Sequence, residues 1–101
     1  MDYMHPSAEF AQNYPLTYAK PIMCGFFAPV EWLDVLRELS AKIEARLTEV
    51  PDENFSVDQV KEKFGGLRFY VNTQDECIHK YIKEAEAKVN EIERHLRGQV
   101  K

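Results

Sequence analysis

The stretch that decides the fold runs from residue 60 to residue 71 and reads Val60-Lys61-Glu62-Lys63-Phe64-Gly65-Gly66-Leu67-Arg68-Phe69-Tyr70-Val71. Two runs in which apolar and polar residues alternate meet at the Gly65-Gly66 pair, and this pattern is a strong signal for a β-hairpin. With Gly65-Gly66 as a two-residue loop, the expected cross-strand pairs are Phe64 with Leu67, Lys63 with Arg68, Glu62 with Phe69, Lys61 with Tyr70 and Val60 with Val71.

Side chains alternate across a strand, so this register divides the hairpin into two faces. The apolar face is expected to hold Val60, Phe64, Leu67, Phe69 and Val71. The other face is expected to hold a basic patch that includes one aromatic side chain: Lys61, Lys63, Arg68 and Tyr70, flanked by Gln59 and Asn72.

This basic face is the candidate partner-binding or anion-binding site, with Gly65 and Gly66 as its turn. A lysine directly opposite an arginine is mildly destabilising unless something anionic lies near. The anion would be a bound phosphate or a carboxylate of this chain. A solvated or internally paired face is the alternative, since most cationic side chains are exposed and contribute little.

A short helix competes with the first half of the hairpin. Ser56-Val57-Asp58-Gln59 fits a capping box, and Val57, Val60 and Phe64 have helical spacing. In this interpretation residues 57–64 form a helix closed by Gly65, and a strand follows over residues 67–72. We favour the hairpin because the second strand requires a partner and the hairpin provides one locally, but the sequence leaves both possibilities open.

Two amphipathic helices are predicted on either side of the hairpin. The first spans about residues 31–48, between Pro29 and Pro51, and its apolar stripe is Trp32, Val35, Leu36, Leu39, Ile43 and Leu47. The second spans about residues 74–97, with a capping box over residues 73–76 and an apolar stripe at Ile78, Tyr81, Ile82, Ala85, Val89, Ile92 and Leu96. A helix of this length, about 36 Å, is long for so small a core. A homodimer through Val89, Ile92 and Leu96 is therefore one expectation.

Residues 1–30 are rich in proline and aromatic residues and are expected to form an irregular arm. Within the arm, Ser7 can begin a short helix that runs to Asn13, and Ile22–Cys24 can form a strand beside the hairpin. The arm either wraps over its own domain or forms a dimer or partner interface. The expected fold is thus a single α+β domain over residues 1–101: a small antiparallel hairpin or sheet over residues 56–72, packed against two helices.

Composition limits the function classes. With 101 residues, 45% hydrophobic and 30% charged, the chain suits one globular domain. It contains no apolar run of membrane-spanning length and no signal-peptide pattern, and Cys24 and Cys77 suit single thiols in a reducing cytoplasm. A net charge of −4 argues against bulk affinity for nucleic acid.

No sequence motif for catalysis or metal binding is present. His5, His79 and His95 are scattered, and none has the spacing of a metal-ligand pair. We therefore expect no enzyme activity, no cofactor and no metal site. Glu62 is the exception on the apolar face, where a carboxylate requires a partner, and Arg37 and Lys42 are the candidates.

Residues 59–70 also resemble a known signature. They are similar to the KEKFG(G/T)LRFY block of a family of small uncharacterised bacterial and phage proteins, and residues 25–27 and 32–39 are similar to the segment upstream of that block. The chain departs from the family because it lacks the C-terminal Cys-x-x-Cys segment. The resemblance covers about residues 25–85 and implies a phage, prophage or mobile-element setting.

Two hypotheses for function follow. The resemblance, the small size, the acidity and the surplus apolar stripe favour an accessory protein that binds a bacterial protein complex, for example as an inhibitor of a defence system such as CRISPR interference. The alternative is a nucleic-acid-binding or nucleotide-binding accessory protein that uses Lys61, Lys63, Arg68 and Tyr70. Either protein is expected in the cytoplasm, which is the host cytoplasm for a phage-encoded chain.

Overall fold

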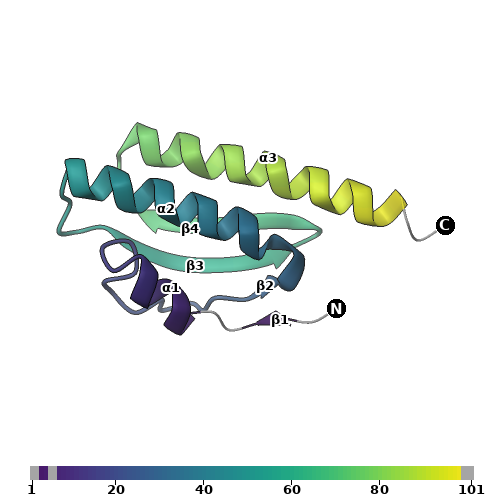
Figure 1. Cartoon of the computed structure of the whole chain (residues 1–101), viewed down its shortest axis with the longest axis horizontal. Coiled ribbons are helices and arrows are strands. Elements are labelled where there is room, and N and C mark those ends of the chain that lie inside the picture. The colour runs from purple at the N-terminus through teal and green to yellow at the C-terminus, as the bar shows by residue number, and fades with distance from the viewer. Residues whose placement is uncertain (1–2, 5–6, 99–101) are drawn as a thin grey trace.

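The computed structural model describes residues 3–4 and 7–98, and the fold is α+β. Its elements in chain order are β1 (Tyr3–Met4), α1 (Ser7–Asn13), β2 (Ala28–Pro29), the 3-10 helix η1 (Val30–Trp32), α2 (Leu33–Glu49), β3 (Ser56–Lys63), β4 (Gly66–Asn72) and α3 (Glu76–Gly98). Helices α2 and α3 lie side by side over one face of the β3–β4 hairpin (Figure 1). The molecule is elongated, 47 × 25 × 20 Å. Of the predicted domain 1–101, residues 1–2, 5–6 and 99–101 lie outside the described residues, as does His5.

The hairpin is confirmed and the competing helix over residues 57–64 is wrong, but the loop lies one residue earlier than predicted. Lys63 pairs with Gly66, so the two loop residues are Phe64 and Gly65. Both have positive φ, 55° and 77°, as a type I′ hairpin turn requires. Gly66 belongs to strand β4, which corrects its assignment to the turn.

The loop position changes the cross-strand pairs but not the faces. Val60 lies opposite Phe69 and Lys61 opposite Arg68, each shifted by two residues from the predicted partner. A β-bulge between Val57 and Gln59 places Val57 opposite Val71. In this register Val57 and Val60 both lie opposite apolar partners and are both buried. Phe64, predicted on the apolar face, instead lies at the exposed tip.

Both long helices are confirmed, with differences at their ends. The core holds the predicted stripe residues of α2 and the buried residues Ile78, Ile82, Ala85 and Val89 of α3. The N-cap of α3 is Asp75 rather than Thr73, because Asp75 Oδ1 accepts a hydrogen bond from the Cys77 N–H at 2.9 Å. Val89 is fully buried within the chain, so its burial requires no dimer partner, and a dimer through this helix stays a prediction. Ile92 and Leu96 are half-buried.

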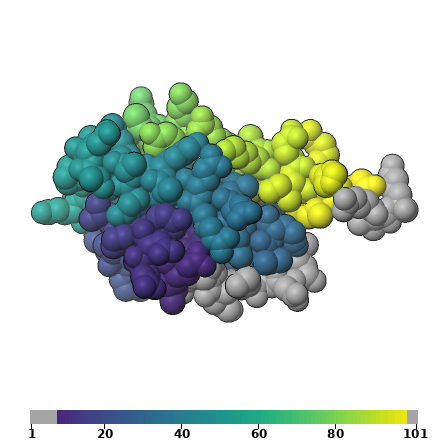
Figure 2. All heavy atoms as spheres, in the orientation of Figure 1, coloured from purple at the N-terminus to yellow at the C-terminus, as the bar shows by residue number. Residues whose placement is uncertain are grey.

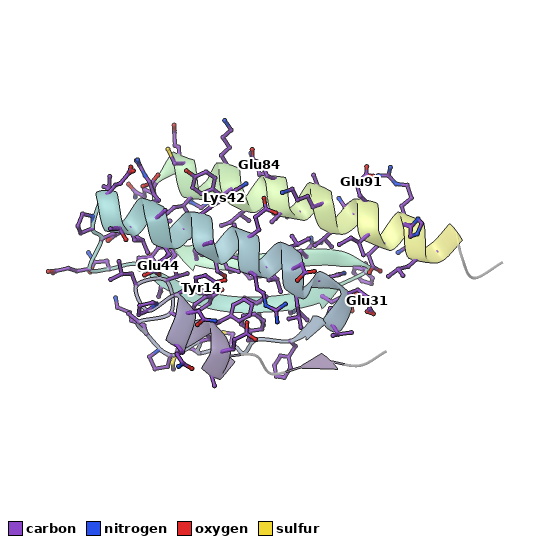
Figure 3. All side chains as sticks on the ribbon, viewed as in Figure 1. Tyr14, Glu31, Lys42, Glu44, Glu84 and Glu91 are labelled. Carbon is purple, nitrogen blue, oxygen red and sulfur yellow. The ribbon has the colours of Figure 1, made fainter. Side chains whose placement is uncertain are left out.

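The N-terminal segment packs on its own domain. Helix α1 occupies the predicted Ser7–Asn13, and Phe10 joins Tyr18 and Phe26 in edge-on or tilted aromatic contacts within the core. Glu44 of α2 accepts hydrogen bonds from the backbone of Leu16 and Thr17, and it lies close to this segment in Figure 3. The arm therefore belongs to the core rather than projecting from it.

Both edges of the hairpin are covered. On the β3 side, the extended segment lies at residues 24–27 rather than 22–24: Val60 N–H donates to Gly25 O and Phe27 N–H donates to Val60 O. On the β4 side, the outward backbone groups belong to Leu67 and Phe69, the residues opposite Glu62 and Val60. These two residues are only 1% and 4% exposed. Strand addition at this edge is therefore unfavourable.

No helix of the described part is long and apolar enough to cross a membrane.

Candidate functional site at the hairpin tip

The turn of the hairpin and the last turns of α3 form a polar cleft, which we call the tip cleft. The β3–β4 turn lies beneath the C-terminal half of α3 (Figure 1). The cleft is lined by Lys63, Phe64, Gly65, Gly66 and Arg68 of the hairpin and by Asn90, Glu93, Arg94 and Arg97 of α3. Four of these nine residues are cations. A protein with a net charge of −4 thus carries a locally cationic end.

Phe64 is the most unusual residue of the tip. Its side chain is 88% exposed, and its φ of 55° is one that a bulky residue rarely adopts. The ammonium group of Lys63 lies 5.8 Å from the centre of the Phe64 ring, within the range of a cation–π contact. Neither the exposure nor the backbone conformation of Phe64 favours folding. Such local conflicts concentrate at functional sites.

The two glycines differ in what they provide. An ideal Cβ at Gly65 would lie 2.5 Å from Nη2 of Arg97, so the guanidinium packs directly on this glycine. The Gly65 N–H also donates to Glu62 Oε2 at 2.7 Å. Gly66 has no positive φ, and a Cβ there would meet Nη1 of Arg68 at 3.4 Å and the backbone oxygen of Lys63 at 3.5 Å, both ordinary van der Waals distances. The turn therefore requires glycine at position 65 and tolerates other residues at position 66.

A buried tryptophan holds α3 against the rest of the fold beside the cleft. Trp32 of η1 is fully buried, and its Nε1 donates a hydrogen bond of 3.0 Å to Glu93 Oε2. This contact joins residues 61 positions apart in the sequence. It fixes the helix segment that carries Asn90, Arg94 and Arg97 into the cleft.

The structure separates the predicted site residues into two groups. Lys63 and Arg68 line the tip cleft, together with Gly65 and Gly66. Tyr70 is half-exposed opposite Gln59 and, with Arg68, lines a different depression beside α3. Lys61 lies opposite Arg68, so the like-charged pair is Lys61–Arg68 instead of Lys63–Arg68.

Residue pattern did not predict the exposure of Phe64 or the presence of α3 residues in the cleft. Arg94 and Arg97 carry a signal in the sequence, as cations in the last turns of a helix, but that signal indicates dipole stabilisation. Their approach to the turn depends on how α3 crosses the hairpin, which residue spacing does not reveal. Glu62 also differs from expectation: it binds the turn, whereas Arg37 pairs with Glu9 and Asp34, and Lys42 with Glu38 and Glu84.

Within the described part of the chain, most cations of the tip cleft, and Lys61 opposite Arg68, form no salt bridge. Within residues 3–4 and 7–98, the salt bridges include none formed by Lys61, Lys63, Arg68 or Arg97. Arg94 reaches Glu91 at 3.4 Å, and both side chains of that pair are largely exposed. Carboxylate and phosphate groups are the natural ligands of guanidinium and ammonium groups. The tip cleft can therefore bind an anionic surface.

The described residues contain no cluster of three or more His, Cys, Asp or Glu side chains able to hold a metal ion. Comparisons with protein-family models, with curated proteins and with solved structures give no significant match. The resemblance to the KEKFG(G/T)LRFY family consequently rests on the residues quoted above.

Proposed function

We propose that this chain is a protein-binding accessory module that presents its hairpin tip to an acidic, pocketed surface of a partner. The observation that carries the proposal is Phe64, an aromatic side chain held fully outward at a strained turn and surrounded by cations. Aromatic and arginine side chains dominate the energetics of protein interfaces. An exposed aromatic knob with a cationic rim suits a partner that has an apolar pocket and acidic edges.

The proposed partner is a bacterial protein complex, and the proposed role is non-catalytic. The resemblance of residues 59–70 supports a phage or mobile-element setting. A small module that occupies a working surface of a larger protein complex blocks that surface, and the proposed role is therefore that of an inhibitor. A defence complex in the cytoplasm, such as one of CRISPR interference, is the candidate target. The geometry of the tip supports the binding of a protein partner, and the resemblance supports the phage or mobile-element setting.

The test is affinity capture from bacterial lysate with matched variants. Wild-type protein should capture one stoichiometric protein complex. Replacing Lys63 and Arg68 with glutamate should lower the affinity for that complex at least tenfold, the effect of losing about 1.4 kcal/mol. The control replaces Lys80 and Lys83, two exposed lysines of α3 outside the tip cleft, and should bind normally. Equal loss with both variants would contradict a specific role for the tip.

A nucleic-acid-binding function is the second candidate, since exposed Phe64 and half-exposed Tyr70 share their depressions with the cations Lys63 and Arg68. Exposed aromatic residues interleaved with cations are typical of single-strand binding surfaces. Titration of a single-stranded oligonucleotide at several salt concentrations tests it. Binding with a steep dependence of affinity on salt, lost in the Lys63→Glu/Arg68→Glu variant, would favour this alternative.

A further inference from the structure

We propose that the chain also associates with itself head to tail, with the Phe64 tip of one copy inserted into a pocket at the opposite end of another. This second site, which we call the loop pocket, lies where the N-terminal segment meets the α2–β3 loop. It is lined by Leu16, Ala19, Lys20, Leu47, Pro51, Asp52, Glu53 and Phe55. The proposal goes beyond the proposed function because the partner here is a second copy of this chain.

The loop pocket has the size and chemistry for an aromatic side chain. Its walls include the buried residues Leu47 and Phe55 and the half-exposed Leu16. Its volume is about 190 Å³. An enclosed apolar cavity of about 150 Å³ is enough to bind benzene, so the volume of this open depression is comparable to what a phenyl ring requires. Among the described residues, Phe64 is the most exposed large apolar side chain.

The two sites cannot meet within one molecule. The loop pocket lies next to the beginning of β3 and the tip at its end, and eight strand residues span about 26 Å. In Figure 2 the α2–β3 loop region and the C-terminal end of α3 lie at opposite ends of the long axis, which measures 47 Å. Insertion of Phe64 therefore joins two different copies. Such a head-to-tail contact builds either an open chain of copies or a closed ring, depending on the rotation between neighbours.

Charge favours this pairing of ends. Around the loop pocket, Glu49, Asp52 and Glu53 are exposed, and the salt bridges within residues 3–4 and 7–98 include none of them. Asp52 accepts hydrogen bonds from the Asn54 N–H and the Thr73 hydroxyl, which hold the loop in shape. The cationic tip thus meets an acidic rim, opposed only in part by Lys20. The association should weaken as salt is added.

Self-association and partner binding use the same Phe64 and therefore exclude each other. A copy whose tip is seated in a neighbour presents no tip to another protein. Within a chain of copies, only the terminal tip remains accessible. Dilution would release tips, so the concentration of the protein would control how much of it is competent to bind.

Sedimentation velocity with two complementary variants tests the proposal. Phe64→Asn removes the knob and suits the positive φ, because asparagine tolerates this backbone conformation. Leu16→Lys/Glu53→Lys blocks the pocket and leaves the tip intact. We expect the wild-type sedimentation coefficient to rise with concentration up to about 1 mM. Each variant alone should stay monomeric. Their equimolar mixture should form a 1:1 dimer and nothing larger, because the free site at each end of that dimer is the mutated one and cannot bind a further copy.

Two matched controls should associate like wild type. Met23→Ala removes another exposed apolar side chain, 83% exposed and outside both sites. Val30→Lys/Asp34→Lys repeats the charge change of the pocket variant on η1 and α2. Circular dichroism and melting curves must show that every variant is folded, and Phe64→Ala replaces Phe64→Asn if the latter is not.

Three results would overturn the proposal. They are a wild type that stays monomeric throughout, variants that associate as wild type does, or a mixture that forms no dimer. The proposed function fails separately, because the pocket variant keeps its tip and should capture the same bacterial complex as wild type. Loss of that capture in a folded monomer would count against the partner-binding role of the tip, not against self-association.

Discussion

The helix layer, formed by α2, α3 and the N-terminal segment, differs from the hairpin tip in how many of its cations form salt bridges. Between α2, α3 and the N-terminal segment, Arg37, Lys42, Arg46 and Lys88 each pair with at least one carboxylate, at distances from 2.7 to 3.6 Å. Figure 3 shows Lys42 of α2 directed toward Glu84 of α3. At the tip, the salt bridges of the described residues include none formed by Lys63, Arg68 or Arg97, and Arg94 pairs only with its exposed neighbour Glu91. Charges that join elements of the fold are paired, whereas most cations of the tip form no salt bridge within the described residues, which is what the proposed binding role of the tip requires.

The pKa values of carboxylates in the helix layer reflect these ion pairs. A hydrogen bond from Arg46 lowers the pKa of Asp75, one from Lys88 lowers the pKa of Glu38, and one from Arg37 lowers the pKa of Glu9. A carboxylate with a lowered pKa stabilises the fold at neutral pH and loses that contribution in acid. These ion pairs of the helix layer should therefore contribute to the acid sensitivity of the protein.

The largest expected effect is at Trp32, where the two regions are joined. Trp32→Ala removes a fully buried side chain and its hydrogen bond to Glu93. The free energy of unfolding should fall by about 3–5 kcal/mol, as for other buried aromatic residues. Urea denaturation followed by circular dichroism measures this. A loss below about 1 kcal/mol would show that η1 and α3 are not packed as described.

The next effect separates the two glycines of the tip. Gly65→Val places a β-branched residue at φ 77° and a Cβ against Arg97. The strain should cost about 1–3 kcal/mol of unfolding free energy, whereas Gly66→Val in strand β4 should change it by about 0.5 kcal/mol or less. Thermal melting of both variants compares them. Equal destabilisation would mean that the loop is Gly65-Gly66 after all.

A smaller effect should appear at Asp75, which both caps α3 and pairs with Arg46 at 2.9 Å. Asp75→Ala removes both roles and should cost about 1 kcal/mol or more through the lost cap. Asp75→Asn keeps an N-cap residue and removes only the charge, so the cost should be smaller.

The pH dependence of stability distinguishes the two roles of Asp75. Because its folded-state pKa is lowered, its charge contribution is complete above the ordinary pKa of about 3.9 and is lost as pH falls through the folded value. Melting temperatures measured from neutral pH down to about pH 2 should fall less steeply for Asp75→Asn than for wild type. Identical slopes would show that the ion pair contributes nothing to folding.

Residue pattern predicted those parts of the molecule that depend on local periodicity. The stripes of α2 and α3, the alternation of β3 and β4 and the core positions of Val60 and Phe69 all follow from spacing. The turn could not be placed this way, because Gly65-Gly66 is a better turn sequence than Phe64-Gly65. Tertiary packing of Val57 and Val60, through a bulge, outweighed the local preference.

The site was only partly predictable for a related reason. Lys63 and Arg68 are visible as cations on the polar face of a hairpin, and the structure places both in the tip cleft. Arg94 and Arg97 reach the cleft only because α3 crosses the turn, with Trp32 binding Glu93 from a distant part of the chain. The covered edge of β4 likewise depends on three-dimensional packing, since Leu67 and Phe69 carry no local signal for it.

The smallest expected effect is also the most direct test of the comparison between the two regions. Lys63→Glu/Arg68→Glu should leave the melting temperature within about 4 °C of wild type. Lys63 is exposed and Arg68 is half-buried on the polar face, and surface substitutions usually change stability by about 0.5 kcal/mol or less. The matched double reversal, Lys42→Glu/Lys88→Glu, replaces ion pairs to Glu38 and Glu84 with repulsion and should lower the melting temperature clearly more. Raising the salt concentration should narrow the gap, since these side chains are partly exposed and screening weakens their interactions. If the tip reversal proves the more destabilising, Lys63 and Arg68 belong to the internal ion pairing of the fold, and the cations of the tip are not reserved for a ligand.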